Sequence, residues 1–309
     1  MQIEQINKPM IFIEKGKYFQ NWEDNQFCIG DKDICKTFLN AKKVLWKMKP
    51  KTDDYSNIFY LRLKPNKANK NDGFPSYIME LPNLKQLDIP ISFLEQINKE
   101  NLPECVETLI ITASDIYISN KSNYPQFPET GFEKIKALVL DTPPWLNLVF
   151  NDISISDNNF SNLKYLSTGI DKEGNILEHI KDLQNLEFVE IHNVANHQIF
   201  EYLSYRLKYM YLSEMKKDFS FEKIVLYNDV EFLNIAHSQA EIDCELFLKL
   251  PNLKEIYIRS SKKIKNIEAL LESKNLCSLT VIDCNNPFKK TNRNLFEDIF
   301  NYLLNIDFA

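Results

Sequence analysis

The stretch that decides the fold is LPNLKEIYI at residues 250–258, together with its near copy LPNLKQLDI at residues 81–89. In the first, Leu253 is followed three and five positions later by Ile256 and Ile258. The same phrase begins at Leu84, Val106, Ile135, Leu163, Leu186, Leu207, Val230, Leu253 and Leu276, at intervals of 21 to 29 residues. Nine copies at that period predict an array of structural repeats in which each phrase is one short strand.

The alternation within the phrase predicts which way its side chains face. We expect the first, fourth and sixth positions to point into the core and the positions between them to point outward. Stacked repeats then cover one another's apolar edges. The segments that return to the next phrase differ along the chain. Apolar residues at helical spacing predict helices near residues 176–183, 199–207, 242–250 and 267–276. The proline-containing stretches at 113–131 and 141–147 predict irregular loops.

The pattern resembles the leucine-rich repeat family over residues 41–284. The resemblance implies an α/β solenoid that is curved, with a parallel β-sheet on the concave side and helices and irregular segments on the convex side. It also implies that the concave face binds another protein, and it supplies no catalytic residues. The chain departs from the family in its ninth positions, where asparagine is common: they are Ser92, Ser114, Pro143, Asp171, Val194, Met215, Ser238, Ser261 and Cys284. Serine and cysteine there predict a thinner hydrogen-bond ladder.

The ends of such an array need caps, because the last apolar edge would otherwise meet water. Residues 285–309 contain apolar side chains on one face of a predicted helix, which we expect to be the C-terminal capping helix. Residues 1–40 contain short apolar runs with little helical period and predict a β-containing N-terminal cap. An independent small domain is the alternative. Two further strand phrases, Ala41/Val44/Trp46 and Ile58/Leu61/Leu63, follow this segment.

Composition excludes several classes of partner. Apolar residues make up 44% of the chain, the formal net charge is −6, and the sequence pI is about 5.4. Because the basic clusters are short, we expect no nucleic-acid binding. No apolar run approaches the ~20 residues of a membrane span, and no secretory leader is visible at residues 1–10. Six scattered cysteines without a CxxC pair favour a reducing compartment, so we expect a cytoplasmic protein.

Outward positions of successive strands align into columns. The third position carries four consecutive aromatic residues, and two more rings stand at the fifth position beside them: Tyr165, Phe188, Tyr209, Phe232, then Tyr211 and Tyr257. Since parallel strands lie about 4.8 Å apart, these six residues predict one contiguous aromatic patch and are the candidate binding residues. Truncating Tyr209 or Phe232 is expected to weaken binding without changing the thermal midpoint. In the alternative interpretation, the rings merely pack on one another or lie under the N-terminal segment.

Charges and histidines give weaker signals. The second position carries glutamate or lysine from Glu107 to Lys254, with opposite charges in most neighbouring repeats, which predicts either a solvated ladder or a means of fixing register. His192 and His237 follow strands two repeats apart, a separation of ~10 Å that argues against a shared metal ion. No GxSxG, GxGxxG or GxxxxGK[ST] motif occurs. We therefore predict no catalytic residues, no metal and no cofactor.

The leading hypothesis is a non-enzymatic protein-binding module, either a scaffold or an inhibitor. One version is an immunity-type protein that neutralises a basic toxin, which the acidic charge would suit. Two other classes stay open. One is a carbohydrate or small-ligand site on the aromatic row, and the other is an enzyme with an unrecognised site near the N-terminal cap.

Overall fold

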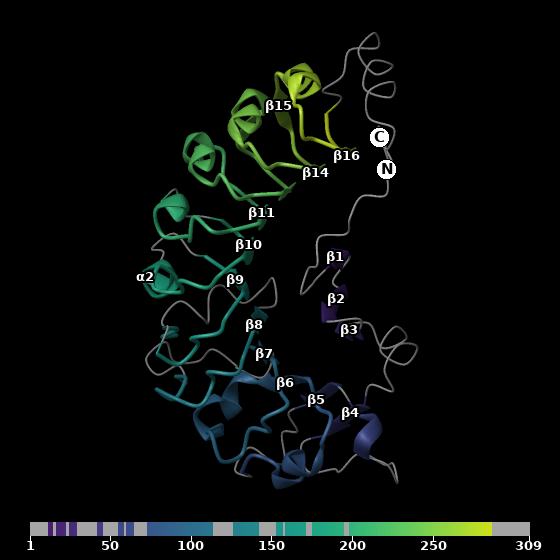
Figure 1. The fold of residues 1–309 in the computed structure, drawn as a ribbon, viewed down its shortest axis with the longest axis vertical. Coiled ribbons are helices and arrows are strands. Elements are labelled where there is room, and N and C mark those ends of the chain that lie inside the picture. Colours follow the sequence, from purple (N-terminus) through teal and green to yellow (C-terminus); the bar gives the residue numbers. More distant parts are fainter. Residues whose placement is uncertain are drawn as a thin grey trace. The chain divides into compact units, whose positions relative to one another are not determined.

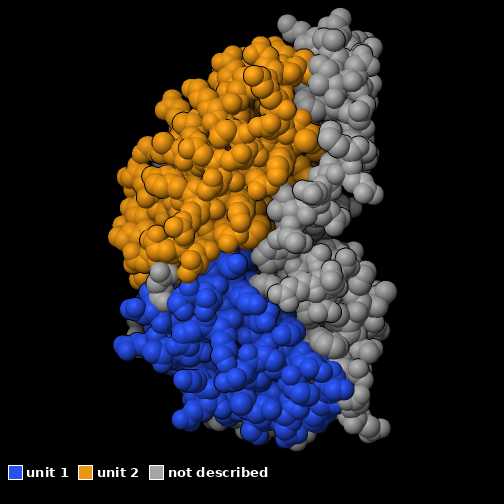
Figure 2. All heavy atoms as spheres, in the orientation of Figure 1, with its two compact units in different colours: residues 1–149, 153–165 blue, residues 150–152, 166–309 orange. Residues whose placement is uncertain are grey.

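The computed structural model describes residues 12–14, 17–22, 25–29, 42–45, 55–58, 60–64, 73–113, 126–141, 153–156, 158–170, 175–194 and 198–285 (Figure 1). The chain divides into two compact units, residues 1–149 with 153–165 and residues 150–152 with 166–309 (Figure 2). Both are built from the repeated phrase. The predicted C-terminal helix at 285–309 lies, apart from Asn285, outside the described residues.

The second unit holds one parallel sheet whose strand order follows the chain. Its strands are β10 (Phe188–His192), β11 (Tyr209–Ser213), β12 (Phe232–Ala236), β14 (Glu255–Arg259) and β16 (Ser278–Ile282). Within this unit the strands line the inner side of an arc, and short helices line its outer side (Figure 1). A second, two-stranded parallel sheet, β13 (Glu241–Asp243) with β15 (Lys263–Lys265), lies in the return segments.

The first unit repeats the arrangement with β4 (Lys42–Leu45), β5 (Tyr60–Lys64), β6 (Gln86–Pro90), β7 (Thr108–Thr112) and β8 (Ala137–Asp141). Neighbouring strands again pair in parallel. Strand β9 (Tyr165–Gly169) begins in this unit and continues in the second. The Tyr165 N–H donates to the Lys136 carbonyl at 3.1 Å, and the Ile170 N–H donates to the His192 carbonyl at 3.1 Å.

Three N-terminal strands pair antiparallel instead: β1 (Phe12–Glu14), β2 (Lys17–Trp22) and β3 (Asn25–Ile29). They lie in the segment for which strands were predicted from the sequence. Whether this segment caps the array or forms a domain of its own stays a prediction.

The strand register is the one that the phrase predicts. Leu233 lies opposite Ile256, and Ile256 opposite Leu279, so the fourth position of each phrase pairs with the fourth position of the next. The inward residues are buried: Leu253, Ile256 and Ile258 expose 2%, 1% and 0% of their surfaces. Burial of such side chains contributes ~1.5–3 kcal/mol each. The register differs at the first pair of strands, where Val44 lies opposite Leu63 instead of Leu61.

The return segments are helical, but most are 3-10 rather than α-helices. Among the described residues one short α-helix, α2 (Asn175–Ile180), is present, whereas η6 (Glu222–Leu226), η7 (Cys244–Lys249) and η8 (Ile267–Glu272) are 3-10 helices. Further 3-10 helices in the described ranges are η1 (Tyr55–Asn57), η3 (Ser76–Glu80), η4 (Ile91–Gln96) and η5 (Ile199–Glu201).

The spacing of buried residues explains this correction. Buried side chains recur every three residues, at Cys244, Phe247 and Leu250, whereas Leu246, which an α-helical spacing placed in the core, is half-exposed. A period of three matches the 3-10 helix, whose rise of about 2.0 Å per residue spans a short repeat with fewer residues.

The ninth positions form the thin ladder predicted from serine and cysteine. The Ser238 N–H donates to Ser261 Oγ at 3.2 Å, and the Ser261 N–H donates to Cys284 Sγ at 3.4 Å. These side chains are buried, so each satisfies a backbone donor that water cannot reach. The Val194 side chain has no hydrogen-bonding group, and its backbone N–H donates to the Ser213 carbonyl at 3.0 Å. Ser114, Pro143 and Asp171 lie outside the described residues.

A second ladder stands at the opposite end of the phrase and was not predicted. The residue before the first position is often asparagine, and its side-chain amide donates to a carbonyl two residues before the first position of the preceding repeat. The bonds are Asn83 to Ser56 at 2.8 Å, Asn162 to Glu133 at 2.6 Å, Asn252 to Asn228 at 3.0 Å, and Asn275 to Pro251. Each links one repeat to its predecessor, so the strand-entry asparagines join repeats where the family's usual ninth-position asparagines are missing.

We expect Asn252→Ala to lower the free energy of unfolding by ~1 kcal/mol, because the Asn228 carbonyl loses its donor while the exposed site limits the loss. Urea denaturation measures the change. Asn228→Ala is the matched control, since the Asn228 backbone accepts the bond and its own exposed side chain is not needed for it. Equal losses in both variants would contradict a role for the ladder.

The turn after each strand in the second unit uses the same unusual backbone. The eighth residue has a positive φ in five successive repeats: Asn193, Glu214, His237, Ser260 and Asp283, with φ between 46° and 61°. Side chains other than glycine adopt this region at a cost of ~1 kcal/mol. The geometry lets the ladder continue, since the His237 N–H donates to the Arg259 carbonyl at 2.9 Å.

Candidate functional site

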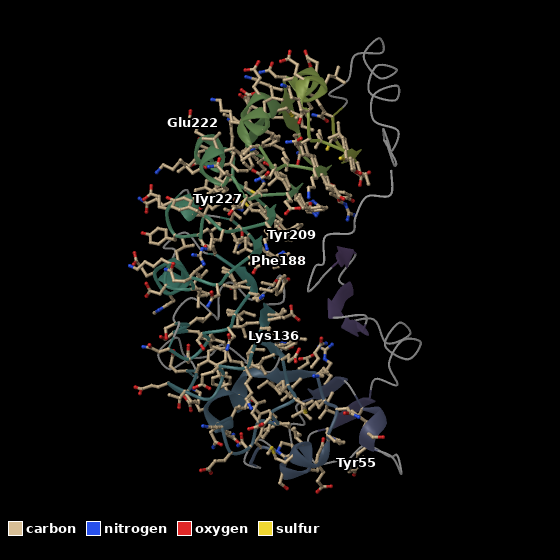
Figure 3. The ribbon with its side chains drawn as sticks, viewed as in Figure 1. Tyr55, Lys136, Phe188, Tyr209, Glu222 and Tyr227 are labelled. Carbon is tan, nitrogen blue, oxygen red and sulfur yellow. The ribbon has the colours of Figure 1, made fainter. Side chains whose placement is uncertain are left out.

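The third, fifth and seventh positions, counted from the start of each phrase, share one face of the sheet in the second unit. We call this face the concave face. Strand pairing aligns Tyr209 with Phe232 and Asn234 with Tyr257 on it. Phe188 and Tyr209 lie on the inner side of the arc, and Glu222 and Tyr227 lie on its outer side (Figure 3). A rigid, fully hydrogen-bonded sheet holds these side chains at fixed spacing, as a preorganised binding face requires.

The six predicted binding residues divide into two groups. Tyr165, Phe188, Tyr209 and Phe232 expose 0%, 3%, 7% and 5% of their surfaces, so the third-position rings are buried. Tyr211 and Tyr257 are half-buried. The expectation of an exposed patch is therefore wrong for the third-position column.

Rings of neighbouring strands pack against one another. The Tyr209 and Phe232 rings stack with centroids 4.9 Å apart, and the Phe188 and Tyr209 rings are tilted at 6.4 Å. This confirms the alternative in which the rings pack on each other, for the three rings of the second unit. The other alternative, cover by the N-terminal segment, concerns residues most of which lie outside the described part of the chain.

A buried polar chain crosses the same face. The Tyr209 hydroxyl donates to Glu190 Oε1 at 3.4 Å, and Asn234 makes a side-chain hydrogen bond to Tyr209. Burial and the Glu190 charge raise the pKa of Tyr209, so its hydroxyl stays protonated and able to donate. Glu190 exposes none of its surface. Burying a carboxylate on a sheet face is costly unless the carboxylate is hydrogen-bonded. We therefore count the hydrogen-bonded side chains of Glu190, Tyr209 and Asn234 as part of the core.

His192 stands at the end of this chain, where β10 ends. Its Nε2 lies 3.4 Å from Ser167 Oγ, its Nδ1 lies 3.5 Å from Ser213 Oγ, and its ring centroid lies 5.1 Å from that of Tyr211. Although solvent reaches part of the ring, burial lowers the pKa of His192 to about 4. A neutral imidazole bonded to two hydroxyls is positioned by its surroundings at neutral pH.

Two functional candidates, Glu190 and Arg259, do not stand out in the sequence. Glu190 stands in the fifth-position column, but nothing in the sequence marks it as buried. Arg259, the last residue of β14, stands at the seventh position counted from Leu253, one residue beyond the six-residue phrase. Extending the columns by one outward position would have found it.

The charged second positions pair as their alternating signs suggest. Lys208 Nζ lies 2.8 Å from Glu187 Oε2, and Lys254 Nζ lies 2.7 Å from Glu231 Oε2. In the first unit, Lys85 and Lys136 both lie 3.3 Å from Glu107. These groups are partly exposed, so each pair contributes only ~0–1 kcal/mol.

The first unit carries its own polar cluster on the corresponding face. Arg62 Nε lies 2.9 Å from Asp88 Oδ2, and the Thr112 hydroxyl donates to Asp88 Oδ1 at 2.8 Å. Asp141 stands nearby at the end of β8. Burial and the Asp88 charge raise the pKa of Asp141 to about 6, against the opposing charge of Arg62.

Asp141→Asn is expected to stabilise the protein at pH 7. A folded-state pKa of about 6, above the usual 3.8, means that the folded protein favours the protonated carboxyl of Asp141. The protein therefore loses stability as the pH rises from 3.8 to about 6. The asparagine cannot ionise, and we expect a gain of ~1–2 kcal/mol at pH 7 that vanishes near pH 4. Chemical denaturation at both pH values measures it. Asp88→Asn is the contrasting control and should destabilise, because Asp88 accepts from Arg62 and Thr112.

Metal-ligating residues do not gather in the described ranges, which hold no group of three or more histidine, cysteine, aspartate or glutamate side chains fit to bind an ion. Of the four histidines, His179, His192 and His237 lie in the described part, and His197 does not. No helix among the described residues is long and apolar enough to cross a membrane.

Comparison with known proteins gives little beyond this geometry. No family model matches the chain, and no curated protein matches it. Among solved structures it is similar to an internalin (inlF) from Listeria monocytogenes, at 13% identity and a TM-score of 0.44 over 74% of this chain. It is also similar to an internalin C2 (inlC2) from that species, at 15% identity and a TM-score of 0.29 over 78% of each chain. The chain spans 63% of the length of the first.

The fold is therefore established by the chain's own geometry. Each phrase from residue 84 to residue 281 forms one strand, its first, fourth and sixth positions are mostly buried, and the strands pair in parallel within each unit. The described repeats form a leucine-rich-repeat solenoid.

Proposed function

We propose that this chain is a non-enzymatic module that binds another protein through the concave face of its second unit. The observation that carries the proposal is the pair of half-buried tyrosines, Tyr211 and Tyr257, held by a rigid sheet beside Arg259. Tyrosine and arginine are the residue types most enriched in binding hot spots. Partial exposure on a fixed scaffold offers contact area with little entropy left to lose.

The buried rings support this face from below. Phe188, Tyr209 and Phe232 pack against one another, and the polar chain through Glu190 fixes Tyr209. In this proposal Phe188, Tyr209 and Phe232 hold the surface in shape, and Tyr211 and Tyr257 make the contacts. The charge pairs at the second position lie along the edge, where they would orient a partner more than they add affinity.

A carbohydrate site is the second candidate, and the burial of the aromatic row disfavours it. Stacking a sugar requires exposed ring faces, and only Tyr211 and Tyr257 of the six rings offer partly exposed surface. A cytoplasmic location also stays part of the proposal. Cys105, Cys244, Cys277 and Cys284 are free thiols, which supports a reducing compartment.

The test begins by capturing a stoichiometric partner from native lysate on the full chain and then measuring its affinity by calorimetry. We expect Tyr257→Ala to weaken binding by ~1–3 kcal/mol, because the partner loses a hot-spot ring. Unfolding should change by less than ~1 kcal/mol, since the ring is half-exposed. Tyr205→Ala is the matched control: Tyr205 is 57% exposed and contacts Tyr227, which lies on the outer side of the arc. If Tyr205→Ala weakens partner binding and Tyr257→Ala does not, the site lies on the convex side and the proposal is wrong.

A further inference from the structure

Arg259 ends strand β14 on the concave face. It lies two residues beyond Tyr257, so both side chains leave the same side of the strand. Its neighbours in register are Ala236 on β12 and Ile282 on β16, neither of which carries a charge. Arg259 is half-buried at the edge of the proposed binding face.

The positive charge of Arg259 has no carboxylate partner among the described residues. No described aspartate or glutamate oxygen lies within 4.0 Å of its guanidinium, and its Nε is shielded from water without an acceptor. A buried N–H left without an acceptor loses its hydration and regains nothing. The free chain therefore holds at this point a donor that a ligand could satisfy.

Arg62 shows what a satisfied arginine looks like in this fold. It stands on the corresponding face of the first unit, and its Nε lies 2.9 Å from the buried carboxylate of Asp88. The same atom of Arg259 has no such oxygen. An aspartate or glutamate carboxylate brought from outside would give Arg259 the contact that Asp88 gives Arg62.

The groups around Arg259 narrow the chemistry of the ligand. Asn234, one strand away and in register with Tyr257, has a buried Oδ1 without a donor, because its amide nitrogen is the end that can donate to Tyr209. Arg259 lacks a hydrogen-bond acceptor for its Nε, and Asn234 lacks a donor for its Oδ1. The Cα atoms of the two residues lie roughly 8 Å apart along the diagonal of the sheet. An acidic residue in a peptide chain brings both, a carboxylate and a main-chain N–H.

We propose that Arg259 anchors an aspartate or glutamate side chain of the protein partner, with Asn234 accepting a main-chain N–H of the same segment. This inference rests on the proposed function, since it names the chemistry that the concave face recognises. The carboxylate takes Nε and one terminal nitrogen side by side, the geometry in which arginine binds carboxylates best. The long side chain turns to present that edge, while Tyr211 and Tyr257 flank the contact.

The test uses a small probe, so that it does not depend on the partner. The probe is aspartate blocked as its N-acetyl, N-methylamide derivative, and the matched control is blocked asparagine, which lacks only the charge. The nitrogen-15-labelled full chain is titrated while the Nε–H signals of its arginines are followed by NMR. Arg259→Lys assigns the Arg259 signal by its disappearance.

We expect the Arg259 signal to move with blocked aspartate and not with blocked asparagine, while the Arg62 signal, already paired, stays in place. In Arg259→Lys, which keeps the charge and loses the planar fork, we expect about tenfold weaker binding, read from the ring signals of Tyr211 and Tyr257. An unmoved Arg259 signal overturns the inference. So does equal movement with asparagine, or saturation by inorganic phosphate well below the aspartate range, which would indicate a phosphate site instead.

The two proposals fail separately. If blocked aspartate leaves the Arg259 signal unmoved but Tyr257→Ala weakens partner binding, the proposed binding face is supported and the proposed carboxylate contact of Arg259 is wrong. If Arg259 binds blocked aspartate but no protein partner senses Tyr257, the anion site stands and the proposed function falls.

Discussion

Leu253→Asp is expected to unfold the repeats around β14, because the side chain at the first position of that phrase is 98% hidden from water. A charge at that depth has no partner and no hydration, which costs more than ~4 kcal/mol. Each repeat is stable only against its neighbours, so the loss spreads to β12 and β16. Circular dichroism gives the lost structure, and hydrogen exchange locates it.

Gln239→Asp is the matched control for that experiment. It adds the same charge one residue after Ser238, the ninth position of the preceding repeat, at an exposed site whose backbone N–H donates to the Met215 carbonyl. It should change stability by less than ~0.5 kcal/mol. A folded Leu253→Asp protein with native exchange in β14 would show that the first position does not point into the core.

Phe232→Ala has the second largest expected effect, a loss of ~3–4 kcal/mol in the free energy of unfolding. The sequence alone predicted an unchanged thermal midpoint, on the view that the third position faces solvent. Since Phe232 is 5% exposed and stacks on Tyr209 at 4.9 Å, its removal opens a cavity beside a buried ring. Urea denaturation followed by circular dichroism measures the loss.

Two variants make this result interpretable. Phe232→Leu keeps most of the volume and should cost less than half as much. Tyr257→Ala removes a ring from the same face where it is half-exposed, and should cost less than ~1 kcal/mol. If Phe232→Ala is as mild as Tyr257→Ala, the aromatic column does not belong to the core of the second unit.

The repeat architecture was predictable because its cause is local. Leu, Ile and Val at the first, fourth and sixth positions bury themselves whatever lies elsewhere, and the parallel pairing of Ile256 with Leu279 follows from the shared phrase. The return segments were less predictable. A run such as CELFLKL contains apolar residues at spacings of both three and four, and the length of the repeat, which no local pattern records, selects the 3-10 form with Phe247 buried.

The candidate site was predictable only in its alignment. Columns of outward residues follow from strand register, so Tyr209 and Phe232 were correctly placed side by side. Their burial depends on contacts that the phrase does not encode, and the sequence could not reveal it. The same holds for Glu190 and Arg259, whose meaning depends on whether an opposite charge lies nearby.

The strand-entry asparagines have a consequence for how such a chain can evolve. Each donor reaches the repeat immediately before it, and where the asparagine is present the donor and the acceptor stand at the same two positions of the repeat, as with Asn252 on Asn228 and Asn275 on Pro251. A gene duplication or deletion that adds or removes one whole repeat leaves every surviving bond in register. An insertion of any other length within a phrase leaves both a donor and an acceptor without their partners. Selection would therefore tolerate changes in the number of repeats more readily than insertions or deletions of a few residues.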